Sequence, residues 1–483
     1  MAKIILTIFI FSIFMADQAL GKEAILRIPL HASTISLDPS KVQDISSLWV
    51  SRQINCQLVR MNKGVSTLEA AQSIQYVSPV LIDVKIKPNI YFTNRSEVTA
   101  QDVIATFDYL RKKRSVLRNV FGWIKGMTLK SKYELQIKLK QPTPQLFAVL
   151  SAPHYAIFEK NFIAKVTKDP SLWREPVSCG DYKIEESSSS YVTLSSIKGK
   201  GMPVRFSLIP DSQLLAKDMD NYDLISMQVI GDSKSLSKFK LMNVFDPFQY
   251  YFVLNTRIPP WNTRNARCAF FSKINPNIVM SVYGERAERA DDFLPSGTLG
   301  YVKTNNYMEE ITSQFKNAPL PAKKSICVSP VATSIEKDYR DVYLNMIKKI
   351  YPNATSKPIK NYTDLNSELQ KKKCDGVFYA AKSNYLDAYE YFVTFAEKGP
   401  SATGFHDKEL TKKIKNSQGI NRADLRAKEY HSIVKNITHE CLMYPLFTMP
   451  YDIVYVRNNL NVAGIGEGAI NEYLLSNVKL INS

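Results

Sequence analysis

The sequence predicts an α/β protein, and two segments carry most of that prediction. The pattern between Lys324 and Ala380 alternates strand, helix, strand, helix and strand, which is typical of a parallel sheet with right-handed crossovers. A long amphipathic helix follows from about Asn421, with apolar residues at three- and four-residue steps as far as Cys441. Because the chain has 483 residues, far more than one core accommodates, we expect two or three domains.

In the first part of the chain, extended apolar patterns predict strands at Ala24–Leu30, Val84–Phe92 and Glu134–Leu139. Thr99 and Asp102 form a capping box, which predicts that a helix begins there. Apolar residues at helical spacing follow this start, so we expect the helix to bury one face.

The parallel unit in the second part rests on five consecutive segments. They are a short strand at Ser325–Ser329, a helix at Asp341–Tyr351, an extended run at Lys357–Tyr362, a helix capped by Thr363 and a strand at Asp375–Ala380. Ligands bind such sheets at the carboxyl ends of the strands. The residues after the last strand, from Ala381 to Tyr385, are therefore a candidate binding site on geometry alone.

The N-terminus predicts export. Lys3 precedes an apolar run from Ile4 to Met15, and Ala19-Leu20-Gly21 gives the small residues that a signal peptidase requires. The run is too short to span a bilayer, which takes roughly 20 residues. We expect cleavage before Lys22. No cysteine directly follows this site, so we expect no attached lipid. The mature protein is thus predicted to be periplasmic, soluble and free of a lipid anchor.

The net charge is +18, from 63 Lys and Arg against 45 Asp and Glu. Such a surplus can mark a nucleic-acid-binding protein, but the basic residues are spread along the chain and no nucleic-acid-binding motif is present. The densest runs, Arg111–Arg114 and Lys371–Lys373, fall at predicted helix ends, where cations complement the helix dipole in water. We expect no nucleic acid partner, with weak attraction to anionic headgroups or acidic ligands as the alternative.

The sequence does not decide whether its six cysteines form disulfides or remain free thiols. They are Cys56, Cys179, Cys268, Cys327, Cys374 and Cys441. An oxidising compartment permits disulfides, and six cysteines allow 15 pairings among which the sequence does not choose. Free buried thiols are the alternative. Neither the cysteines nor the five histidines show metal-ligand spacing, so we expect no metal and no other cofactor.

Enzyme signatures are missing, which favours a binding protein. We find no G-x-S-x-G elbow, no P-loop and no complete G-x-G-x-x-G fingerprint. His431 and His439 lie eight residues apart on one predicted helix, about 12 Å along its axis, which is too far for one metal ion. We therefore predict that the protein is not an enzyme.

Five segments, in order, resemble the family 5 extracellular solute-binding proteins, the peptide-binding subunits of bacterial ABC importers. The segments are Leu37-Asp38-Pro39, Val98-Thr99-Ala100-Gln101-Asp102-Val103, Gly180-Asp181-Tyr182-Lys183-Ile184, the run from Asn255-Thr256-Arg257 through Pro259-Pro260-Trp261 to Arg267, and Tyr444-Pro445-Leu446-Phe447. Together they cover nearly the whole mature chain. One such segment is weak evidence, but five in the right order are specific.

The resemblance implies a two-lobed, periplasmic-binding-protein-like type II fold with an extra sub-domain inserted in the first lobe. Ligand is held between lobes that close by a hinge. The implied division is a signal peptide at 1–21, lobe I at 22–45, the inserted sub-domain at 46–170, lobe I again at 171–245, lobe II at 246–450 and a return to lobe I at 451–483.

The resemblance also implies where ligand residues lie. Gln43, Asp44 and Ile45 fall where peptide-binding members line the cleft, and Tyr250 falls where the chain crosses between lobes. The candidates after the last parallel strand, or close behind it, are Lys382, Ser383, Asn384, Tyr385 and Asp387.

One of these positions departs from the family pattern. Ala381 and Asn384 stand where members carry a Trp and the Asp that pairs with a peptide's amino group. Asn384 cannot neutralise a buried ammonium, and Lys382 favours an anion. We therefore expect that free peptide N-termini are not recognised, or are recognised through Asp44 or Asp387.

These observations predict an exported receptor that captures a peptide or peptide-like small solute and delivers it to the permease subunits of an ABC importer. We expect it to act as a monomer. The alternatives are a periplasmic sensor or chaperone of the same fold without a transport role, and a receptor for a non-peptide anionic solute.

Overall fold

The computed structural model describes residues 24–481, apart from internal gaps. The gaps are residues 31, 43, 63–64, 113–121, 144, 198, 200, 210–214, 216, 227–235, 291, 304–306, 332–338, 360–367, 384–386, 393–394, 396–402, 421 and 463–473. The predicted signal peptide, Gln43, Thr363, Asn384, Tyr385 and Asn421 lie outside the described residues.

Lobe I is built around a four-stranded sheet in the order β1-β10-β9-β8. Its strands are β1 Leu26–Leu30, β10 Val204–Leu208, β9 Tyr191–Ser196 and β8 Tyr182–Ser187, with β1 parallel to β10 and the other pairs antiparallel. Helix α2 (Ile45–Ile54) packs on this sheet through Trp49, whose ring lies 5.6 Å from Phe206. The same core takes in Val454 and Val478, so residues from both ends of the described chain share it.

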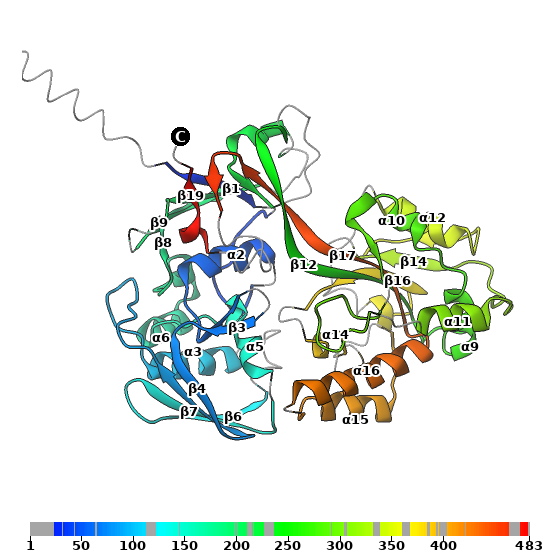
Figure 1. Ribbon diagram of the computed structural model, residues 1–483, viewed down its shortest axis with the longest axis horizontal. Coiled ribbons are helices and arrows are strands. Elements are labelled where there is room, and N and C mark those ends of the chain that lie inside the picture. The colour runs from blue at the N-terminus through cyan, green and yellow to red at the C-terminus, as the bar shows by residue number, and fades with distance from the viewer. Residues whose placement is uncertain are drawn as a thin grey trace, which may run out of the picture.

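The inserted sub-domain has its own core and an antiparallel sheet in the order β4-β5-β7-β6. The strands are β4 Ala71–Ser78, β5 Leu81–Ile86, β7 Glu134–Leu139 and β6 Ile124–Leu129; the hairpin β2 Val59–Asn62 and β3 Val65–Leu68 and the helices α3 Ala100–Lys112, α5 Leu146–Leu150 and α6 Lys160–Lys168 complete it. Figure 1 places it below the lobe I sheet, at the side that faces lobe II.

Local signals were accurate in this sub-domain, with one exception. The predicted capping box is present, because the backbone N–H and the hydroxyl of Thr99 donate to the Asp102 carboxylate at 2.8 and 2.6 Å. The strand predicted at Val84–Phe92 is wrong in its limits, since β5 ends at Ile86. Pro88 has no N–H to donate, and Asn89 turns the chain with a φ of 64°.

Two long antiparallel strands, β12 (Phe239–Leu254) and β17 (Met443–Arg457), run from lobe I into lobe II (Figure 1). On β12, Val244 belongs to the lobe I core, whereas Tyr250 belongs to a lobe II core. On β17 the same change occurs between Val454 and Met449. The chain thus crosses between lobes inside one hydrogen-bonded ladder. The limits of the lobes in residue numbers stay a prediction.

The sheet that contains this ladder has the order β11-β17-β12-β16-β14-β15, with β13 paired to β17. Strand β11 pairs with the lobe I end of β17, and the other strands added here lie in lobe II. The additional strands are β11 Leu224–Ile225, β13 Glu288–Arg289, β14 Cys327–Pro330, β15 Thr355–Ser356 and β16 Gly376–Ala381. Strand β14 is parallel to both neighbours, and α12 (Arg340–Lys348) connects β14 to β15, as predicted. The extended run predicted from Lys357 is wrong in its start, because strand β15 spans Thr355–Ser356 and ends before Lys357.

Helices cover both faces of this sheet and enclose two cores. They are α9 Arg264–Phe271, α10 Asn277–Met280, α11 Tyr307–Phe315, α14 Tyr389–Phe392, α15 Lys408–Ser417 and α16 Ala423–His439. The predicted stripe of α16 is confirmed, because Tyr430, Val434 and Ile437 are fully buried. Cys441 lies beyond the end of the helix.

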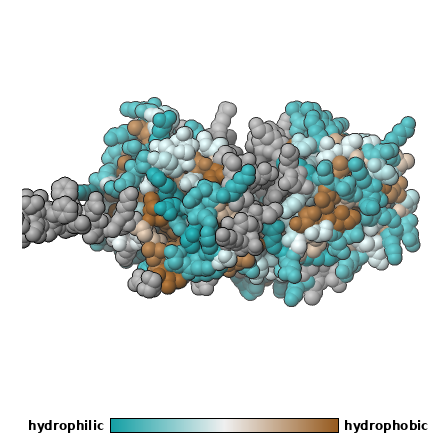
Figure 2. Space-filling view, turned by 90° about the horizontal axis from the view of Figure 1, so that it is seen from above, coloured by the Kyte–Doolittle hydropathy of each residue, from teal (hydrophilic) through white to brown (hydrophobic). Residues whose placement is uncertain are grey.

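The described residues of the two basic runs are exposed. The sequence predicted this, because it assigned both runs to helix ends in contact with water. Arg111 and Lys112 are exposed in the last turn of α3, and Lys371, Lys372 and Lys373 are exposed too. Seen from above, the described surface is mostly hydrophilic, with apolar residues gathered in a few patches (Figure 2). The remaining pair of short strands, β18 Leu460–Asn461 and β19 Lys479–Leu480, lies beside the lobe I sheet.

Two disulfides cross-link the described chain. Cys56–Cys179 lies within the sub-domain core, and Cys268–Cys441 links α9 to the residues just before β17. Cys327 and Cys374 are free thiols. Both alternatives left open by the sequence are therefore realised in one chain.

Removing the Cys268–Cys441 bridge should destabilise lobe II, because the bridge closes a long loop in the unfolded chain. We expect Cys268→Ala/Cys441→Ala to lose about 2–4 kcal/mol of unfolding free energy in urea titrations. The matched variant Cys327→Ala, which removes a free thiol, should lose about 1 kcal/mol or less. Equal losses in the two variants would contradict a structural bridge.

Candidate functional site

The crossing between lobes is where the ladder of β12 and β17 loses its regular pairing. The register shifts between Phe245 and Phe248, and again between Tyr250 and Tyr251. Prolines stand at both shifts: Pro247 and Pro450 at the first, and Pro445 opposite Tyr251 at the second. Proline donates no hydrogen bond, and bulges bend strands. The regular pairing is therefore interrupted between the two lobes, which is the place for a hinge.

On the lobe I side, the predicted ligand segment begins helix α2. Asp44 is the N-cap, and its carboxylate accepts a hydrogen bond from the Ser47 N–H at 2.7 Å. The remainder of Asp44 is exposed, and Ile45 keeps 42% of its surface accessible. Both side chains are therefore available to a ligand, as the resemblance implies.

His154 supports this segment from the sub-domain, although no sequence motif pointed to it. It lies in a short 3-10 turn, Pro153–Tyr155, and hydrogen-bonds the backbone of Val42. Burial lowers the pKa of His154 to about 4, and the nearby charge of Asp44 offsets only part of that effect. At neutral pH the imidazole is uncharged and anchors the chain directly before Asp44.

On the lobe II side, Lys382 follows the end of β16 and reaches back to the crossing. Its Nζ lies 4.9 Å from the ring centroid of Phe248, the residue at which the ladder resumes after the first register shift. This contact is a cation–π interaction that places a positive charge beside the hinge. Lys382 is thus well placed for the predicted attraction of an anion.

Tyr250 lies mostly inside the lobe II core. Its ring stacks on Phe447 at 4.4 Å and packs against Tyr283 at 5.7 Å, which leaves 8% of its surface accessible. A ligand could contact only an edge of this ring. The predicted ligand role of Tyr250 stays untested, and its packing role is clear.

Asp387 is buried and already has partners. Its carboxylate accepts hydrogen bonds from the Tyr430 hydroxyl at 2.6 Å and the Tyr389 N–H at 2.9 Å, and lies 3.5 Å from Arg426 Nε. Burial raises the pKa of Asp387, whereas the hydrogen bond from Tyr430 and the charge of Arg426 act in the opposite direction. Ser383, also buried, holds the Asp387 backbone through its hydroxyl at 3.1 Å.

The pairing of Asp387 with Arg426 was missed at the level of sequence. Arg426 lies four residues before Tyr430 on α16, and so on the same face of the helix as the buried stripe. An arginine on that face could have indicated a buried acidic partner. Because Asp387 is 4% exposed and neutralised internally, it is a poor partner for a ligand ammonium.

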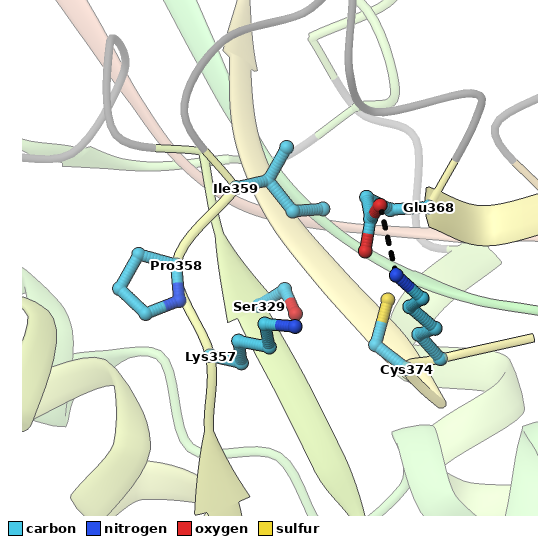
Figure 3. A pocket seen from close by; sticks show the side chains of 7 residues that line it. Ser329, Lys357, Pro358, Ile359, Glu368 and Cys374 are labelled. Carbon is cyan, nitrogen blue, oxygen red and sulfur yellow. Dashed lines mark hydrogen bonds and ion pairs between the residues drawn. The ribbon is translucent and has the colours of Figure 1, made fainter.

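A hollow of about 210 Å³ opens on lobe II, away from these residues. It is lined by Ser329, Lys357, Pro358, Ile359, Glu368, Lys373 and Cys374. Glu368, labelled in Figure 3, forms an ion pair with Lys373 at 3.4 Å. Since none of the predicted ligand residues is among those that line it, the hollow is not the interlobe site.

Within the described part of the chain, no group of three or more His, Cys, Asp or Glu side chains is placed to hold a metal ion. Among the same residues, none of the helices combines the length and apolar character needed to span a bilayer.

Comparison with known proteins identifies the architecture. Residues 80–403 match the family described as bacterial extracellular solute-binding proteins, family 5 Middle. The chain belongs to this family. Oligopeptide-binding protein AppA of Bacillus subtilis (strain 168) is 21% identical over 441 residues, which cover 81% of this chain and 78% of AppA.

Solved structures of similar fold confirm the two-lobed type II architecture. DppA from Helicobacter pylori, in complex with the peptide STSA, is 17% identical with a TM-score of 0.78 and covers 95% of this chain and 98% of its own. AgaA from A. tumefaciens R10, in complex with agropinic acid, is 16% identical with a TM-score of 0.79 and covers 95% and 99%. The matched family is described as extracellular solute-binding proteins.

Breaking the buried pair should cost far more than breaking an exposed one. We expect Arg426→Met to lose about 3–5 kcal/mol of unfolding free energy, because it leaves the Asp387 carboxylate buried without a cation. Adding Asp387→Asn should recover part of that loss. The exposed pair Arg422–Asp424 provides the control, and Arg422→Met should lose about 1 kcal/mol or less. Equal losses in the two single variants would refute the buried pair.

His154 should make the protein less stable as the pH falls. The folded pKa of about 4 lies below the ordinary value of 6.5, so the unfolded chain binds a proton that the folded chain excludes. Stability is full above pH 6.5 and declines between 6.5 and 4, by up to about 2 kcal/mol at pH 5. Urea titrations at pH 7.5 and 5 should show this loss reduced in His154→Gln and retained in His439→Gln, which alters an exposed histidine.

Proposed function

We propose that this protein is an exported receptor that captures a small solute between its lobes by hinge closure and delivers it to an ABC importer. The observation that carries the proposal is the interrupted β12–β17 ladder. Two separately packed lobes are joined there; Lys382 of lobe II lies beside the crossing, and the exposed Asp44 and Ile45 begin helix α2 of lobe I. Family membership and the apolar N-terminal run support export with removal of residues 1–21.

The solute is a peptide or a peptide-like small molecule, and the charges near the crossing narrow its chemistry. Asp387 is neutralised by Arg426, so the exposed Asp44 is the better partner for a ligand ammonium. Lys382 offers a cation on the opposite lobe. A solute that carries an amino group at one end and a carboxylate at the other would satisfy both.

A non-peptide anionic solute is a second candidate, favoured by Lys382 and by the position of Asn384. AgaA shows that this fold accommodates an organic acid, agropinic acid. In that case Lys382 would carry recognition and Asp44 would contribute little.

Mass spectrometry of the small molecules released on denaturing the natively exported protein tests the proposal. We expect one solute per chain, either short peptides or a single organic acid. If peptides are found, Asp44→Asn should weaken their binding by at least about tenfold, as expected for loss of a charge-assisted hydrogen bond. If an organic acid is found, Lys382→Ala should weaken binding to that extent and Asp44→Asn should not.

An exported protein that releases no solute, and that binds neither a pool of short peptides nor a pool of organic acids, would contradict the proposal. Gln136→Ala, an exposed substitution within the sub-domain sheet, serves as the control for both variants.

A further inference from the structure

Side chains of the inserted sub-domain contact lobe II directly. The residues that make these contacts lie outside β12 and β17. Gln141 Nε2 donates a hydrogen bond to Gln418 Oε1 at 3.2 Å. The rings of Trp123 and Tyr389 meet edge to face, with centroids 6.3 Å apart. We call these two contacts the seam. Figure 1 shows the elements involved, β6 and α5 on one side and α14 and α15 on the other, facing each other across the lower part of the molecule.

Charges of lobe II also act on sub-domain tyrosines next to the seam. Burial raises the pKa of Tyr76 to about 12, and the charge of Arg426 reduces that effect. Burial raises the pKa of Tyr155, and the charge of Glu390 adds to it. Two sub-domain residues therefore contact lobe II at 389 and 418, and two more lie within electrostatic reach of Glu390 and Arg426.

The seam is connected to the candidate ligand segment. Tyr389 donates its N–H to the Asp387 carboxylate, and Asp387 is held in turn by the Ser383 hydroxyl. Lys382 directly precedes Ser383. A ligand that contacts Lys382 would thus act on the stretch of chain that positions Tyr389.

The chemistry of the seam suits a reversible contact. It consists of a neutral hydrogen bond and one edge-to-face aromatic pair, each of modest strength. Gln418 is buried, yet its Nε2 has no hydrogen-bond partner among the described residues, which makes the contact costlier than a fully satisfied one. Such a contact can stabilise a closed form without locking it.

We propose that the seam is a latch: the sub-domain, rather than the sheet of lobe I, closes on lobe II, and its own side chains stabilise the closed form whatever solute is bound. Trp123, Gln141, Tyr389 and Gln418 then set the closing equilibrium, separately from the residues that recognise the solute.

Tryptophan fluorescence reports on the latch. Trp49, Trp173 and Trp261 are each at most 4% exposed, whereas Trp123 is only half-buried and would become accessible on opening. The test compares wild type with Gln141→Ala/Tyr389→Ala, both unfolded and refolded to strip solute. The matched control is Gln136→Ala/Tyr91→Ala, whose side chains have partners within the sub-domain.

We expect the seam variant to shift the ratio of closed to open molecules by about three- to tenfold toward open. Acrylamide quenching and the radius of gyration from small-angle scattering should both rise, while the control matches wild type. In a Trp123→Phe background the change in quenching should disappear. If Tyr389→Ala fails to fold, Gln418→Ala with Gln141→Ala replaces it.

Unchanged quenching and an unchanged radius of gyration in a folded seam variant would overturn the latch. The result does not depend on which solute the protein binds, so a failure of the latch leaves the receptor proposal standing, and the reverse also holds.

Discussion

The pairing of β12 with β17 joins the two lobes of the protein. It is one antiparallel ladder, from the pair Phe239–Arg457 to the pair Val253–Met443, and its two ends lie in different hydrophobic cores. The pairing holds the lobes together, while the prolines at the register shifts interrupt it between them. A rigid ladder would fuse the lobes into one body, and a flexible linker would leave their relative position undefined.

The site follows from this frame, because β12 also pairs with β16, places Ala381 opposite Gln249 and so brings Lys382 against Phe248 at the start of the segment that leads to Asp387. The buried ion pair with Arg426 then removes a carboxylate from ligand recognition and uses it to position the chain. Recognition is left to groups nearer the surface. A receptor built in this way can change its solute through a few exposed side chains while the hinge and the cores stay the same.

Local sequence patterns predicted the elements whose determinants are local. The capping box of α3, the strand at Glu134–Leu139 and the buried stripe of α16 all depend on residues within a turn or two of each other. The disulfide pairing, the contact of Asp387 with Arg426 and the burial of Tyr250 depend on residues that are distant in sequence, so no spacing rule could reveal them. The assignment of Asp44 and Ile45 to the ligand cleft came from family resemblance and stays a prediction, and the structure adds the neutral His154, which hydrogen-bonds the backbone of Val42 near the start of their segment.

The rotation of lobe II relative to lobe I, measured from crystal structures with and without the solute that co-purifies, tests the hinge most directly. We expect each lobe to superimpose on itself, with backbone dihedral changes confined to residues 245–251 and 445–451. Solute bound outside the crossing, or a rearrangement spread through the cores with the ladder unchanged, would contradict a hinged receptor.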